Sequence, residues 1–99
     1  MRFEEHVRRA LDSLPPDLAR GLENVAVVVE DENPDDPDLL GLFEELPYMP
    51  AKVTIYRLPL VESFLEPEEL EREIRITVLH ELAHYFGIDE ERLDELGFG

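Results

Sequence analysis

The chain has 99 residues, and its 25 acidic residues against 9 basic ones give a formal net charge of −16. This charge argues against nucleic acid and anionic membranes as partners, because both call for a basic protein surface. A hydrophobic fraction of 43% is enough for a packed core, and the absence of cysteine excludes disulfides. No apolar run reaches the about 20 residues of a membrane span, and residues 1–5 do not form an apolar core like that of a signal peptide. We therefore expect one cytoplasmic domain over residues 1–99.

The first part of the chain predicts helices followed by a strand. Apolar residues at helical spacing predict a helix over residues 3–14, which the next two prolines end. Residues 17–22 are predicted as a second, short helical turn. The β-branched run 25–29 predicts a buried strand, and the acidic, proline-rich segment 31–38 predicts a solvated loop.

Two further strands are expected before the longest helix. Residues 39–46 predict a short strand around positions 41–43, which a proline ends. The alternating segment 52–58 predicts another strand, and Pro59 ends its regular pairing. The pattern over residues 60–65 fits either the remnant of a strand or a short helix.

A long helix is predicted from about residue 66 to residue 86. Pro67 suits the first helical position, and the acidic residues around it suit the positive end of the helix dipole. Gly87 is a plausible C-cap. Residues 89–96 predict a last short helix, which Gly97 stops.

An HExxH motif, formed by His80, Glu81 and His84, lies near the end of this helix. Residues four apart on a helix share one face, so both imidazoles can reach one zinc ion. Glu81 lies about 100° further round the helix, given 3.6 residues per turn. From that position its carboxylate can take a proton from a metal-bound water without binding the metal itself.

The remainder of this helix is apolar on most sides, as expected for a buried helix. Its polar stripe comprises Glu73, Thr77, His80 and His84, with Glu81 at the edge. Such a stripe suits a helix that lines a cleft. Thr77 and Glu73 are candidate hydrogen-bond partners for the imidazole N–H groups.

A tetrahedral zinc site with an open position needs a third protein ligand. The chain can turn back after Gly87, so the carboxylate of either Glu90 or Asp89 could complete the site. His6 is less suited, because it is expected on an exposed N-terminal helix. Tyr48, Tyr56 and Tyr85 could polarise a scissile carbonyl, but tyrosines at such positions are more often packing residues.

The pattern His80-Glu81-x-x-His84-x-x-Gly87-x-x-Glu90 resembles the short bacterial zincin-like metallopeptidases, called minimal zincins, whose motif is HExxHxxGxx(D). The resemblance covers most of residues 25–99. It implies an α+β fold in which a small mixed β-sheet packs against the long HExxH helix, with short N- and C-terminal helices. It also implies one Zn²⁺ ion and a peptidase role. The family usually carries Asp where this chain has Glu90, and glutamate is a competent zinc ligand.

These features lead to two main functional hypotheses. The first is a zinc-dependent metallopeptidase that hydrolyses peptide bonds, with Glu81 as general base and a peptide or protein as its substrate. The second is a non-catalytic zinc-binding module, in which the metal stabilises the fold or a partner-binding face. A metal-free acidic interaction domain would require the motif to be accidental. We expect a monomer or a weak homo-oligomer.

Overall fold

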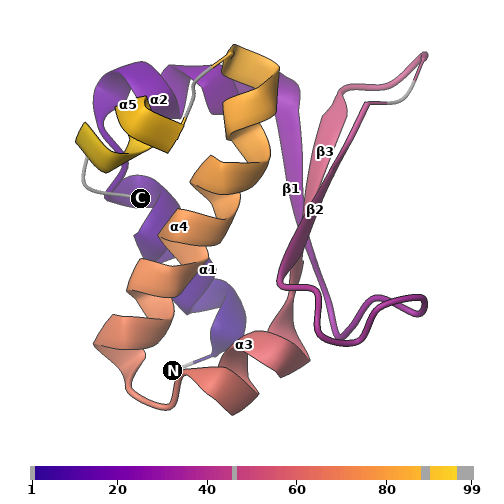
Figure 1. Cartoon of the computed structure of the whole chain (residues 1–99), viewed down its shortest axis with the longest axis vertical. Helices are drawn as coiled ribbons and strands as arrows, with labels where there is room; N and C mark the ends of the chain where they lie inside the picture. Colours follow the sequence, from indigo (N-terminus) through magenta and orange to yellow (C-terminus); the bar gives the residue numbers. More distant parts are fainter. Residues whose placement is uncertain (1, 46, 88–89, 96–99) are drawn as a thin grey trace.

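Helices and one small sheet make up the computed structural model, which describes residues 2–45, 47–87 and 90–95, except for the side chains of residues 84–86, 90 and 93. The fold is α+β, as predicted (Figure 1). In chain order the elements are α1 (Phe3–Asp12), α2 (Pro16–Gly21), the short 3-10 helix η1 (Leu22–Asn24), β1 (Val25–Glu30), β2 (Gly41–Glu44), β3 (Ala51–Tyr56), α3 (Arg57–Ser63), α4 (Pro67–Phe86) and α5 (Glu90–Glu95).

The sheet is mixed, with the strand order β1-β3-β2. β1 runs parallel to β3 and pairs Val27 with Val53, whereas β2 runs antiparallel to β3 and pairs Phe43 with the same residue. The central strand carries the most buried side chains, since Val53 and Ile55 have no exposed surface. β1 and β2 therefore form the two edges of the sheet.

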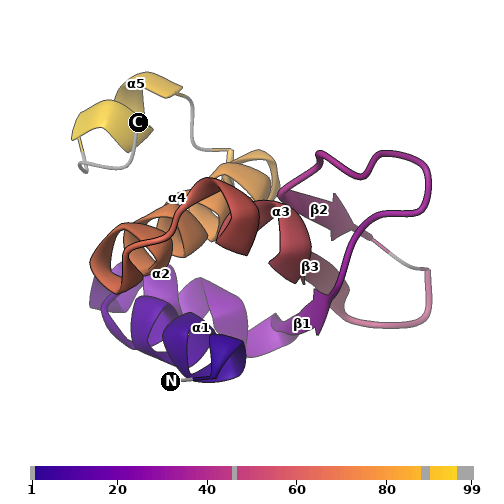
Figure 2. The ribbon, with the colours of Figure 1, turned by 90° about the horizontal axis from the view of Figure 1, so that it is seen from below.

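Helices α1 and α4 lie together on one face of the sheet (Figures 1 and 2). The main core joins Ile74 and Val78 of α4 to Val53 and Ile55 of β3, with Val7 of α1 in the same cluster. A second cluster joins the N-terminal helices to the later part of α4. Its buried members are Leu14, Leu18, Leu79 and Ala83. The helix that bears the HExxH motif is thus held from two sides by apolar contacts.

The segment after the central strand differs from its prediction. The strand expected over residues 52–58 ends at Tyr56, and helix α3 begins at Arg57. The Leu58 N–H donates to the carbonyl oxygen of Asp31 at 2.9 Å, so it is used outside the sheet. Pro59 is accommodated because the first turn of a helix needs no N–H donor there. Of the two alternatives for residues 60–65, the helix is correct as far as Ser63.

His6 corrects another expectation. Its helix was predicted to expose it, but the residue is only 7% exposed and its Nδ1 lies 2.8 Å from Oε1 of Glu71 on α4. The prediction of exposure is wrong because α1 packs directly on α4, which the one-dimensional pattern does not reveal. Within the described residues, no helix has the length and apolar character needed to cross a lipid bilayer.

Candidate active site

Helix α4 begins and ends as its sequence predicts. Pro67 occupies the first turn with Glu68 and Glu69, and the Leu70 N–H donates to the carbonyl oxygen of Glu66 at 2.8 Å. At the other end Gly87 adopts a left-handed conformation with φ 67°, and its N–H donates to the carbonyl oxygen of Ala83. Glycine adopts this conformation without the steric penalty of a Cβ. The backbone of positions 80–84 is therefore regular helix just before a defined end.

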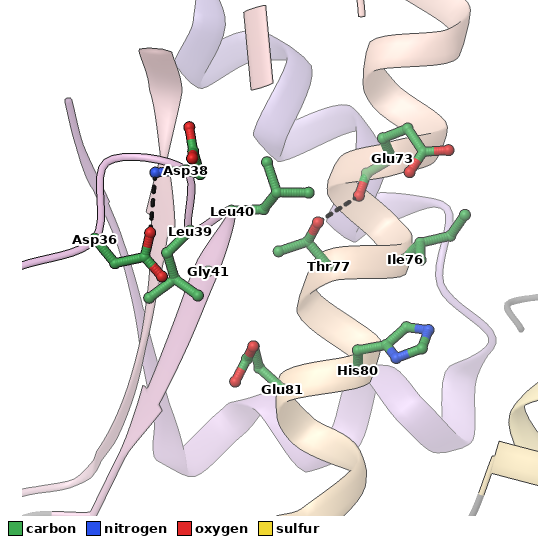
Figure 3. Close-up of a pocket in the computed structure, with 10 residues that line it drawn as sticks. All are labelled: Asp36, Asp38, Leu39, Leu40, Gly41, Glu73, Ile76, Thr77, His80 and Glu81. Carbon is green, nitrogen blue, oxygen red and sulfur yellow. Dashed lines mark hydrogen bonds between the residues drawn. The ribbon is translucent and has the colours of Figure 1, made fainter. Parts of the chain in front are cut away.

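A cavity of about 420 Å³ opens between α4 and the segment that leads into β2 (Figure 3). Asp36 and residues 38–41 form one wall. The other wall comes from α4, and its lining residues are Glu73, Ile76, Thr77, His80 and Glu81. Four of the five residues predicted for the polar stripe of the helix thus line one cavity, and the fifth, His84, lies outside the described side chains.

His80 and Glu81 occupy neighbouring sides of α4 within this cavity. Figure 3 shows the Glu81 carboxylate extending toward β2, while the His80 ring lies on the adjacent side of the helix. Oε2 of Glu81 accepts a hydrogen bond of 3.1 Å from the backbone N–H of Phe43. His80 is exposed, and among the described residues its imidazole has no hydrogen-bond partner. The ring is therefore accessible to a ligand from solvent.

Thr77 and Glu73 lie one and two turns before His80, as expected of candidate imidazole partners. The Thr77 hydroxyl donates to the backbone carbonyl oxygen of Glu73 at 2.8 Å, and Thr77 is only 7% exposed. This bond occupies the hydroxyl proton but leaves the oxygen able to accept a second bond. A contact with the imidazole stays a prediction for both residues. Ile76, expected on the apolar arc, is half-buried and lines the cavity.

Several predicted site residues lie outside the described part of the chain. They are the side chains of His84, Tyr85 and Glu90, and the whole of Asp89. Among the side chains that the structure does describe, no three from His, Cys, Asp and Glu stand together as a metal-binding group. The metal ligands named from the sequence thus remain a prediction.

The cavity wall opposite α4 is acidic and internally ordered. Oδ1 of Asn33 accepts the N–H groups of Asp35 and Asp36 at 2.8 and 3.0 Å, and Oδ1 of Asp36 accepts the Asp38 N–H at 3.2 Å. Such bonds hold a loop in a turn without regular secondary structure. The acidic loop is exposed, as predicted, but it also contributes Asp36 and Asp38 to the cavity, which the sequence did not suggest.

Two further features of the site were missed from the sequence. One is Gly41, where a Cβ would lie 2.6 Å from Cγ2 of Thr77, and the other is the backbone N–H of Phe43. A glycine inside a predicted strand is a usable signal, because it often marks a close approach of two backbones. Neither described tyrosine lines the cavity. The Tyr56 hydroxyl accepts a partly buried hydrogen bond of 2.9 Å from Nδ2 of Asn33, and Tyr48 is fully exposed.

Comparisons with known proteins bear on this site. A family model described as zincin-like metallopeptidase matches residues 22–99, which include the sheet, α4 and every predicted site residue. Among solved structures, a conserved hypothetical protein from Thermus thermophilus is similar, with 27% sequence identity and a TM-score of 0.57. The similarity covers 86% of this chain and 91% of that one. No curated protein matches the chain.

Proposed function

The chain belongs to the zincin-like metallopeptidase family, and from this premise we propose that it is a zinc-dependent peptidase with Glu81 as general base. The observation that carries the proposal is that His80 and Glu81 line one open cavity on α4. An accessible imidazole beside a carboxylate in a cavity is the arrangement that hydrolysis by a metal-assisted route needs.

We assign the zinc ligands to His80, His84 and Glu90, with Asp89 as the alternative third ligand. The donor chemistry fits zinc, which takes imidazole nitrogen and carboxylate oxygen in sites that keep one position open. Regular helix from Pro67 to Phe86 supports the pairing of positions 80 and 84, because residues four apart share a helix face. When bound, zinc would supply Lewis-acid polarisation of the substrate carbonyl and lower the pKa of a water ligand.

In this proposal Glu81 moves the protons. Its carboxylate accepts a proton from the attacking water and later donates it to the leaving amine. The hydrogen bond from the Phe43 N–H to Oε2 supports this role, because it directs the carboxylate toward the wall of the cavity formed by β2. Thr77 and Glu73 line the same cavity and are proposed to orient the imidazole rings.

The substrate is proposed to be an extended peptide. β2 is an edge strand beside the cavity, so a peptide backbone could pair by strand addition with the outward-facing backbone groups of β2 that Glu81 does not occupy. Among the residues that the structure describes, the lining includes four carboxylates, from Asp36, Asp38, Glu73 and Glu81, and no lysine or arginine. This charge favours basic or neutral peptides over acidic ones. A single domain acting as a monomer or weak homo-oligomer remains our expectation.

The proposal is tested by incubating the zinc-loaded protein with a peptide library beside the Glu81→Gln variant. Glutamine keeps the size of the side chain but cannot take the proton, so cleavage should stop while both proteins hold one zinc ion. Equal inertness of the two zinc-loaded proteins would instead support the non-catalytic zinc module. For that alternative, removal of zinc by a chelator should cause a large loss of helical circular dichroism.

A further inference from the structure

We propose that strand β2 positions the general base: the Phe43 N–H holds the Glu81 carboxylate, and Gly41 sets the strand–helix separation that permits this bond. The inference rests on the proposed role of Glu81. It assigns Gly41 and Phe43 as positioning residues, since neither is proposed to touch the reacting atoms.

The direction of the Phe43 N–H follows from the register of the sheet. In an antiparallel pair, the backbone groups of successive residues point alternately toward and away from the partner strand. The Tyr56 N–H donates to the carbonyl oxygen of Leu40 at 3.0 Å, so Leu40 faces β3. By this alternation the backbone N–H and carbonyl groups of Gly41 and Phe43 point away from β3. The Phe43 N–H thus lies on the outer edge of the sheet, where Oε2 of Glu81 accepts it at 3.1 Å.

The separation between β2 and α4 depends on the missing side chain of Gly41. A Cβ at this position would lie 2.6 Å from Cγ2 of Thr77, 3.3 Å from the backbone carbonyl oxygen of Thr54 and 3.5 Å from Cγ of Glu81. Thr77 has little freedom to yield, because it is buried and its hydroxyl is bonded to the carbonyl oxygen of Glu73. Any side chain at position 41 therefore has to move the strand away from the helix. Such a movement would lengthen the bond from Phe43 to Glu81.

This arrangement matters for a general base because the glutamate side chain has three rotatable bonds. A donor on the backbone of a paired strand is fixed in space, so it restricts the carboxylate to few orientations before a substrate binds. Preorganisation of this kind speeds the chemical step, since a reacting group displaced by about 1 Å can cost on the order of 100-fold in rate. A bond that only tied the strand to the helix would affect stability without affecting kcat.

The contact itself is tested by amide hydrogen exchange at Phe43, measured by NMR on the full chain. Glu81→Ala removes the acceptor and should speed exchange of the Phe43 N–H about fivefold, as expected for loss of one hydrogen bond. Glu81→Gln retains an acceptor oxygen and should exchange nearly as slowly as the wild type. Equal exchange in Glu81→Ala and the wild type would overturn the proposal, whatever the protein hydrolyses.

The positioning role is tested by kinetics on a cleaved peptide with a rescue variant. Gly41→Ala should lower kcat by on the order of 100-fold while KM changes less than about threefold, because the base is displaced from the attacking water, whereas alanine keeps the backbone groups of β2 with which the peptide pairs. Adding Thr77→Ser removes Cγ2 but keeps the hydroxyl, so the double variant should regain at least about tenfold of the lost kcat. Gly21→Ala, a glycine-to-alanine change on α2, controls for the substitution and should leave kcat unchanged.

Zinc content and unfolding temperature are measured for every variant. A rise in KM without a fall in kcat, or no recovery in the folded double variant, would contradict the positioning role. If the wild type cleaves no peptide, the proposed function fails, and the exchange measurement still decides whether Glu81 is held by the strand.

Discussion

Nδ1 of His6 lies 2.8 Å from Oε1 of Glu71, and this contact links the N-terminal helix α1 to the site helix α4. The side chains are 9% and 18% exposed, and Nε of Arg9 approaches the same carboxylate oxygen at 3.4 Å. Residues 1–21 precede the part of the chain that the zincin-like family model matches. α1 thus supports the helix of the candidate site from outside the matched region.

Replacing His6 by alanine should destabilise the fold. The change leaves a largely buried carboxylate without its closest partner and also removes apolar ring surface. We expect a loss of about 2 kcal/mol in the free energy of unfolding, or a fall of roughly 10 °C in Tm. Asp17→Asn is the control, because the Asp17–Arg20 pair is exposed and 3.9 Å long, and should change stability by less than about 0.5 kcal/mol. Urea unfolding followed by circular dichroism measures both.

The second apolar cluster should contribute strongly to the stability of α4. Leu79 is 2% exposed and packs with Leu14, which lies between α1 and α2, and with Leu18 of α2. Leu79→Ala should cost about 3 kcal/mol, because it leaves a cavity in a packed interior. Leu65, which is 83% exposed, offers a matched leucine-to-alanine change that should cost less than about 0.5 kcal/mol. Similar losses for the two variants in urea titrations would contradict this packing.

The end of α4 should depend on glycine at position 87. Gly87 has φ 67°, a left-handed conformation that alanine adopts only with strain. Among the described residues, no other atom lies within 4 Å of a Cβ placed there, so alanine would not clash with them. Gly87→Ala should therefore cost about 1 kcal/mol in thermal unfolding. Gly21 has φ −64°, in the right-handed helical region, and Gly21→Ala should not destabilise the protein. A neutral effect at position 87 would argue against the left-handed cap.

Zinc affinity should depend on the predicted ligands and not on the third histidine. His80→Ala and His84→Ala should each weaken zinc binding by more than about 100-fold. Removing a ligand should lower the affinity more than removing a residue that only hydrogen-bonds to a ligand, which typically costs about 10- to 100-fold. His6→Gln should bind zinc like the wild type, because the His6 ring is bonded to Glu71. Calorimetric titration at neutral pH measures the affinities.

The third ligand is assigned by two matched amide substitutions. Glu90→Gln keeps the side-chain length but removes the charge, and we expect it to weaken zinc binding by more than about tenfold. Asp89→Asn serves as its counterpart and should have little effect. The reverse result in the same titrations would assign Asp89 in place of Glu90.

The sequence by itself determined the helix of the site and its ends. Periodicity over residues 66–86, Pro67 at the start and Gly87 at the end are local signals, and they act through the backbone of the same few residues. The same locality explains why strands were predicted over residues 25–29 and 52–58, since β-branched and alternating segments carry their own pattern. The second prediction extended two residues past the end of β3 at Tyr56.

Only the tertiary structure decided what lies against that helix. The burial of His6, the acidic wall of the cavity and the bond from Phe43 to Glu81 each join residues that are far apart along the chain. Such contacts arise when apolar faces pack together, and a pattern along the chain does not record which backbone N–H then meets which carboxylate. The role of Gly41 also depends on tertiary structure, because the lack of a side chain there matters only where α4 approaches β2 closely.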